Sequence, residues 1–237
     1  MQPLAENLIT ETEFWSAIVG AIVGAITAGL IAFGIQLIVL CSAKRQRKAD
    51  HKRTQQALAA SLLFKMMRVH STYVTIHKHF EKSFAEAAER GMKDEPWRFY
   101  TPLASLPKHV DFTSEEMGML LQQKDDEVFN STLQADVVHN AFVDALETLN
   151  TMQPELMERI SPESVEGEVG KIAIPKDEAL ALRPAMINVN SLIEQLRKEA
   201  EKDAVAAGRL LDSLQTLLRG RLGLPYSVGP APQAEGE

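Results

Sequence analysis

An uninterrupted apolar segment near the N-terminus constrains this chain more than any other feature. Residues 14–43 contain no charged side chain, and six Lys or Arg residues follow within the next ten positions. A hydrocarbon core of ~30 Å requires about 20 apolar residues in a helix. The segment is long enough to cross a bilayer with tilt, so the sequence predicts a transmembrane helix over residues 14–43.

The residues that flank this segment predict its orientation. Residues 1–13 carry three Glu and no basic residue, whereas residues 44–53 are strongly basic. Positively charged flanks stay on the cytoplasmic side, and an aromatic ring such as that of Trp15 favours the membrane interface. We therefore expect residues 1–13 to form a short extracytoplasmic tail, Trp15 to be an interface anchor, and the chain after residue 43 to be cytoplasmic at the plasma (inner) membrane. The expected topology signal, which also contacts lipid headgroups, consists of Lys44, Arg45, Arg47, Lys48, Lys52 and Arg53.

Other interpretations of the apolar segment fit less well. A cleaved signal peptide has a basic N-terminal region and a shorter apolar core, whereas this flank is acidic and the run is about twice too long. Transport paths through a membrane helix are marked by ionisable groups, and residues 14–43 carry no charged side chain. These features favour a membrane anchor over a signal peptide or a transport path through a single copy.

Two rows of small residues predict that copies of the segment pack together. Residues four apart share a helix face, and small side chains let two backbones approach closely in lipid. Gly and Ala are also frequent in membrane helices in general, so the alternative is that they only fit the lipid. The first row is Gly20, Gly24 and Ala28, continued by Ala32, and the second is Ala17, Ala21, Ala25 and Gly29.

The distribution of charge limits the partners of the chain. The whole chain carries −7, and residues 54–237 alone carry −9. Nucleic acid is therefore not an expected partner, because phosphate binding requires a basic face. We expect the lipid bilayer and further copies of the chain as partners, together with an unidentified cytoplasmic protein.

A long helix is expected to continue from the membrane segment into the cytoplasm. Between residues 35 and 90 there is neither Gly nor Pro, and Gly91 is a typical helix stop. Apolar residues recur at spacings of three or four in the juxtamembrane part of this stretch, which is one stripe of an amphipathic helix. The stripe consists of Leu58, Leu62, Met66, Val69, Tyr73, Ile76, Phe80 and Phe84.

Three further helices are expected after a Pro-containing connection over residues 91–112. Thr113 and Glu116 have the spacing of a capping box, which predicts a short helix over residues 114–122. Longer helices are predicted over about residues 125–152 and 177–220, separated by a loop. The expected fold is therefore all-α, with the membrane helix entering a cytoplasmic antiparallel helical bundle over residues 54–221. A disordered tail is expected over residues 222–237.

The long helix over residues 125–152 is expected to face the core with one apolar stripe. This stripe consists of Val128, Phe129, Leu133, Val137, Phe142, Leu146 and Leu149.

The sequence offers no motif for catalysis or metal binding. Asp136 and His139 form one carboxylate-xx-His pair, but a di-iron bundle needs two Glu-xx-His motifs and two more Glu. A phosphate-binding loop, a dinucleotide fingerprint, a nucleophile elbow and an HExxH pair are all missing from the sequence. The single cysteine, Cys41, is either an acylation site or simply a small apolar residue, and it excludes an internal disulfide. We expect no catalytic residue, no metal and no cofactor.

These observations favour a single-pass membrane-anchored scaffold or adaptor whose cytoplasmic helical domain self-associates or presents a face to a partner. One alternative is an oligomeric pore-former gated by the cytoplasmic domain, because pore formation needs the same self-association. A second alternative is a membrane-tethered enzyme with an unrecognised site.

Overall fold

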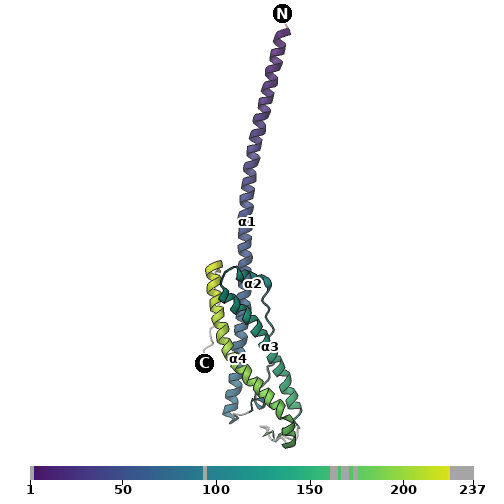
Figure 1. The fold of residues 1–237 in the computed structure, drawn as a ribbon, viewed down its shortest axis with the longest axis vertical. Helices are drawn as coiled ribbons and strands as arrows, with labels where there is room; N and C mark the ends of the chain where they lie inside the picture. The colour runs from purple at the N-terminus through teal and green to yellow at the C-terminus, as the bar shows by residue number, and fades with distance from the viewer. Residues whose placement is uncertain (1–2, 93–94, 161–164, 167–170, 173–175, 225–237) are drawn as a thin grey trace. The chain divides into compact units, whose positions relative to one another are not determined.

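A computed structural model describes residues 3–92, 95–160, 165–166, 171–172 and 176–224 of the chain (Figure 1). For residues 3–14, 26, 28, 165–166, 171–172 and 176–177 it describes the backbone only. The predicted all-helical class is confirmed in these residues, and the chain divides into two compact units, residues 1–54 and 55–237. The helices are α1 (Pro3–Glu89), α2 (Ser114–Leu121), α3 (Asp126–Glu158) and α4 (Lys176–Leu222), with a 3-10 turn η1 (Pro96–Arg98) and two short antiparallel strands, β1 (Val165–Glu166) and β2 (Lys171–Ile172).

The apolar segment and the juxtamembrane stripe belong to one helix, as the sequence predicts. Helix α1 runs without interruption to Glu89. It ends because Gly91 takes a positive φ of 75°, which lets the Met92 N–H bond the Ala87 carbonyl at 2.9 Å. This is a Schellman ending, in which a glycine supplies the left-handed residue.

Helix α2 begins where the capping-box pattern places it. The Glu116 amide N–H bonds the Thr113 hydroxyl at 3.3 Å, and the Glu116 carboxylate accepts from the Thr113 N–H at 2.8 Å. The same carboxylate is almost fully buried against α1, where it accepts from Ser61 at 2.6 Å and Lys65 at 2.7 Å. The capping residue therefore also fastens α2 to α1.

Helices α1 and α4 pack along each other in opposite directions. Gln56 donates to the Leu222 carbonyl at 2.9 Å near one end, and Arg197 donates to Glu81 at 2.9 Å near the other. Between them His70 approaches Gly208 so closely that a Cβ there would lie 3.3 Å from its ring. Six members of the predicted α1 stripe are buried in one core with α4, and its end members Leu58 and Phe84 are partly buried against it. On α4 this core includes Val189, Ile193, Leu196, Ala200, Ala207, Leu211, Leu214 and Leu218.

The predicted core face of α3 is partly wrong. Leu133 and Val137 are 48% and 64% exposed, whereas Thr132 and His139 are completely buried. Thr132 fits the core because its hydroxyl donates to the Val128 carbonyl at 2.7 Å within the helix. A stripe traced from hydropathy alone therefore misses core positions that polar residues occupy, here Thr132 and His139.

The connection before α2 is ordered and extended, and it returns along α3. Asn140 binds both the N–H and the carbonyl of Val110, at 3.0 and 3.2 Å. Asn150 binds both backbone groups of Leu103 at 3.1 Å, so side-chain amides replace the hydrogen bonds that a helix or sheet would supply. Because this return is not helical, α3 runs in the same direction as the part of α1 beside it, and α4 runs opposite to both (Figure 1).

Candidate functional site

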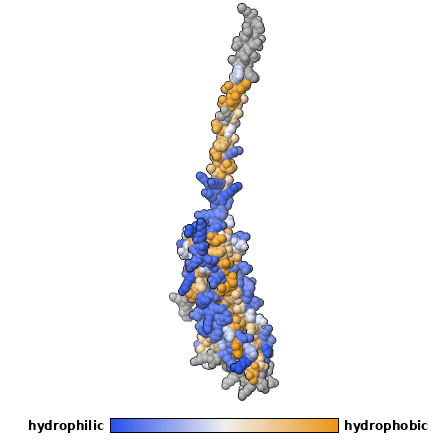
Figure 2. Space-filling view, viewed as in Figure 1, coloured by the Kyte–Doolittle hydropathy of each residue, from blue (hydrophilic) through white to orange (hydrophobic). Residues whose placement is uncertain are grey.

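The apolar segment of α1 presents its large side chains outward on all sides. One helix in the described part of the chain is long and apolar enough to cross a membrane, and its most apolar window is not buried at all. On the face seen in Figure 2, hydrophobic residues cover this part of the helix and hydrophilic residues follow it. The exposed side chains include Trp15, Val19, Ile22, Val23, Leu30, Ile31, Phe33, Ile35, Leu37, Ile38, Val39 and Leu40.

The small residues predicted to pack between copies lie open on this helix. A methyl group added at Gly20, Gly24 or Gly29 would meet no atom within 4 Å. Ala17, Ala21 and Ala25 are exposed as well, whereas the side chain of Ala28 lies outside the described residues. Apart from Ala28, the residues of both rows are thus exposed on the helix.

The basic cluster follows directly, and its six side chains are exposed. Within the described residues it forms one ion pair, between Arg53 and Asp50 at 4.0 Å. The remaining cations are open to contact anionic headgroups, and Cys41 is exposed just before them.

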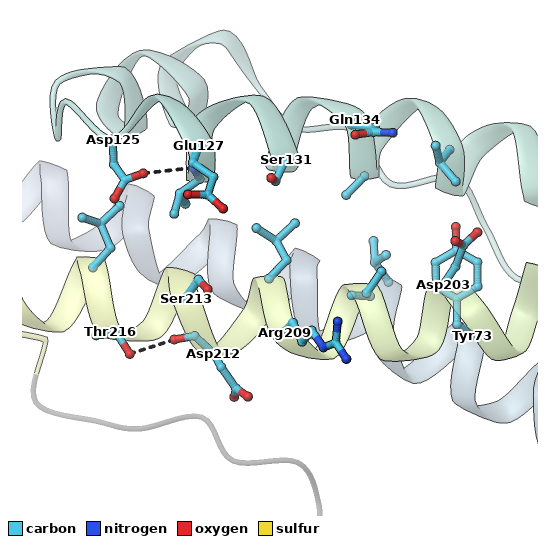
Figure 3. Close-up of a pocket in the computed structure, with 18 of the residues that line it drawn as sticks. Tyr73, Asp125, Glu127, Ser131, Gln134, Asp203, Arg209, Asp212, Ser213 and Thr216 are labelled. Atoms are coloured by element: carbon cyan, nitrogen blue, oxygen red, sulfur yellow. Dashed lines mark hydrogen bonds between the residues drawn. The ribbon is translucent and has the colours of Figure 1, made fainter.

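In the second unit a groove of about 850 Å³ lies between α3 and α4 (Figure 3). Its floor is formed by Val69 and Tyr73 of α1, and its walls carry short or apolar side chains on both helices. These wall residues are Val128, Ser131, Ala135 and Val138 of α3 and Ala206, Ala207, Leu210, Ser213 and Leu217 of α4. Because these side chains are small, space remains between α3 and α4 that larger side chains would fill.

Carboxylates dominate the polar rim of the groove. Asp125 and Glu127 lie on the α3 side, and Asp203 and Asp212 on the α4 side, with Lys202 and Arg209 as the only cations among the described lining residues. Asp125 caps α3 by accepting from the Val128 N–H at 3.0 Å. Burial raises the pKa of Asp203, an effect that Lys202 opposes and Glu199 reinforces.

Tyr73, on the floor of the groove, lies toward the same end of it as Asp203, here called the inner end (Figure 3). Its side chain is 2% exposed, and its hydroxyl has no hydrogen-bond partner among the described residues. Burial raises the pKa of this hydroxyl, and the nearby Asp203 and Glu199 raise it further. The hydroxyl is therefore neutral and able to donate or accept one hydrogen bond.

The histidines and carboxylates considered as metal ligands do not converge. His139 is buried against the Tyr73 ring at 5.7 Å, whereas Asp136 lies within 3.5 Å of the Asn140 amide. His70 faces Gly208 on α4. Within the residues that the structure describes, no group of three or more His, Cys, Asp or Glu side chains is placed to hold a metal ion.

The groove was not found from the sequence, because its residues come from the solvent-facing edges of two distant helices. Tyr73 reads as one more member of the α1 core stripe, and Glu127, Asp203 and Asp212 read as ordinary surface acids. Only the packing of α3 and α4 brings them together.

Comparison of the chain with protein-family models, with curated proteins and with solved structures gives no match. Its function is therefore argued from its own residues.

Proposed function

We propose that the chain is a single-pass membrane protein that presents a helical interaction module to the cytoplasm. Residues 14–43 form the anchor, residues 44–53 hold the following unit on the cytoplasmic side, and the helical unit acts as a scaffold or adaptor without catalysing a reaction. Residues 54–221 form a helical bundle in this account, and the bundle has an open groove for a partner.

The observation that carries this proposal is the exposure of the apolar segment. A helix that is hydrophobic all round is stable either inside a protein core or inside a bilayer. The apolar window of α1 is not buried by any described residue, so lipid is the environment that suits it. The adjoining cations supply the charge asymmetry that orients such a helix.

Self-association through the span is the second part of the proposal. Helices in lipid associate by close packing rather than by hydrophobic burial, and two adjacent rows of small residues offer such a surface. Both rows are open in the described chain, which leaves them available to another copy.

Native mass spectrometry of the full chain in detergent micelles tests the assembly. We expect an oligomer that Gly20→Leu with Gly24→Leu disrupts, because the larger side chains keep the backbones apart. Val19→Leu with Val23→Leu is the matched control, since it adds bulk to the same two turns outside both rows. An oligomer unchanged by the glycine substitutions would exclude packing through these rows, and a monomeric wild type would exclude self-association.

A further inference from the structure

The groove between α3 and α4 holds more negative charge than its own residues neutralise. Glu127, Asp203 and Asp212 form no salt bridge with any described residue, although all three border the same cavity. Arg209 and Lys202 are exposed at the outer edge and also lack a salt-bridge partner in the part of the chain described. The groove thus carries an excess of carboxylates, and at its inner end the nearby Lys202 offsets part of the charge of Asp203.

The Tyr73 hydroxyl adds a second, independent feature at this inner end. Leaving a buried hydroxyl without a hydrogen bond costs on the order of 1–3 kcal/mol, so such groups are usually satisfied by a partner. Tyr73 and Asp203 line the same cavity, and the Asp203 carboxylate is near enough to raise the pKa of the buried hydroxyl. An ammonium or guanidinium group between the two side chains would donate to both oxygens and neutralise the carboxylate.

The shape of the groove indicates which kind of partner structure would carry this cation. Its walls are two helices that run in opposite directions, and the α3 wall carries short or apolar side chains along several turns, from Val128 to Val138. An amphipathic helix lays apolar residues spaced i, i+3, i+4 and i+7 into a groove of this kind. Its polar edges would then lie against the rim of carboxylates.

We propose that this groove docks an amphipathic helix of a partner protein, with one Lys or Arg of that helix bound between Asp203 and Tyr73. The proposal deepens the interaction function proposed above and rests on it, because it names the face that meets the partner and the charge that the partner carries.

Charge also decides against a second copy of this chain as the occupant. Residues 54–237 carry −9, so two such units repel each other at an acidic groove. The strongly basic stretch of the chain, residues 44–53, has a single apolar side chain, Ala49, and therefore no stripe that would fill the groove. A basic partner with an apolar face fits both features of the site.

Peptide binding to the full chain in phosphatidylcholine nanodiscs tests the inference. The probe is a fluorescent helical peptide of about five turns, or about 18 residues, built from Leu and Lys at amphipathic spacing; the same peptide with Glu in place of Lys is the negative probe. We expect the Lys peptide to bind and the Glu peptide not to bind. Asp203→Asn with Glu127→Gln should weaken binding of the Lys peptide at least tenfold.

A matched variant separates the groove from general electrostatic attraction. Glu147→Gln with Glu155→Gln removes the same two charges from exposed positions of α3 outside the groove. We expect this control to bind the Lys peptide within about twofold of wild type. Equal weakening in the two double variants would overturn the proposal, because binding would then follow net charge alone.

Two further measurements keep the test decisive. A photoreactive Lys peptide should crosslink to the groove walls of the wild-type chain, at Ser131, Gln134 or Ser213. This result does not depend on whether any variant folds. Crosslinks confined to other surfaces would overturn the proposal. If butylamine blocks this crosslinking as well as unlabelled Lys peptide does, the groove is a site for small organic cations and the proposed helix docking is overturned. A chain that is membrane-embedded and oligomeric but binds no Lys peptide would refute the docking groove and leave the proposed anchor and self-association standing.

Discussion

The two parts of α1 place the same kinds of residue in opposite surroundings. Leu30, in the apolar segment, is 66% exposed, whereas Leu62, about nine turns further along the same helix, is completely buried. Over residues 14–43 the helix carries no charged side chain; beyond residue 54 it is apolar on one stripe that other helices cover. Because a helix apolar on every side is unstable in water, the contrast supports the proposed placement of the first part in lipid, whereas the second part packs against protein.

The largest expected effect is the loss of membrane insertion when charges are placed within the apolar segment. An Arg at the centre of a membrane helix costs roughly 2.5–3.5 kcal/mol, so Val23→Arg, Leu30→Arg and Leu37→Arg together should abolish insertion. Alkaline carbonate extraction of membranes checks the result: wild type should stay in the pellet and the triple variant should not. Arg at exposed positions 133, 137 and 205 of the helical unit is the control, and it should leave the chain in the pellet.

Truncation of a core leucine should have the next largest effect, and only in the second part of α1. Leu62→Ala removes a fully buried side chain, and such changes cost about 2–5 kcal/mol of unfolding free energy. Phe64→Ala, two residues on and 58% exposed in wild type, should cost less than about 0.5 kcal/mol. Chemical denaturation in nanodiscs, followed by Trp97 fluorescence, compares the two; similar losses would mean that the core is assigned to the wrong face.

The helical unit buries a charged group, the Glu116 carboxylate, whereas the apolar segment contains no charged side chain. Burial would raise the pKa of this group, but hydrogen bonds from Lys65, Ser61 and Thr113 outweigh burial and lower it. Glu116→Gln should therefore destabilise the unit by about 1.5–3 kcal/mol, because it removes the charge that these donors satisfy. Glu115→Gln, at the exposed neighbouring position, should be nearly neutral in the same denaturation experiment.

Acid should loosen the helical unit while leaving the uncharged anchor in place. Burial lowers the pKa of His139 below its ordinary 6.5, and nearby Arg68 and His109 lower it further. The unfolded chain therefore binds a proton first, so stability is complete above pH 6.5 and falls as the pH drops through that value. The slope should approach about 1.4 kcal/mol per pH unit for one proton.

His139→Gln should flatten that slope between pH 6.5 and 5, measured by denaturation at each pH. Protonation of Glu116 also lowers stability as the pH falls, but this effect begins only near its ordinary pKa of 4.5 and below. His51→Gln, at an exposed position, should leave the slope unchanged. An unaltered slope in His139→Gln would place the acid-sensitive group elsewhere.

The smallest effect is expected at the ion pair between α1 and α4. Arg197 donates to Glu81 at 2.9 Å and lies 4.2 Å from the centre of the Phe84 ring. Both charged side chains are partly exposed, so Arg197→Ala should cost at most about 1 kcal/mol. A larger loss in melting experiments would mean that the Phe84 contact, rather than the ion pair, holds these helices together.

Much of the fold was predictable because hydrophobic periodicity reports burial directly. The unbroken helix to Glu89, the capping box at Thr113 and the core stripe of α4 all follow from local sequence. The direction of α3 did not follow, because it depends on an extended return held by Asn140 and Asn150 rather than by a recognisable element. In the sequence these asparagines are polar positions of an amphipathic helix, and such positions usually face solvent.

The candidate sites divide in the same way. The proposed anchor and its basic flank consist of consecutive residues, so composition alone was enough to predict them. The groove depends on which edges of α3 and α4 face each other, and residues such as Glu127 and Asp203 are nearly 80 positions apart. No local pattern predicts their meeting.

The orientation of the chain across a membrane is the most direct test of the account. In a Cys41→Ser background, a new cysteine is introduced either at Glu6 or at Glu147, and cells that express each variant are treated with a membrane-impermeant maleimide. We predict that Glu6→Cys reacts in intact cells and that Glu147→Cys reacts only after permeabilisation. Reaction of Glu147→Cys in intact cells would contradict the cytoplasmic placement of the helical unit, and with it the proposed function.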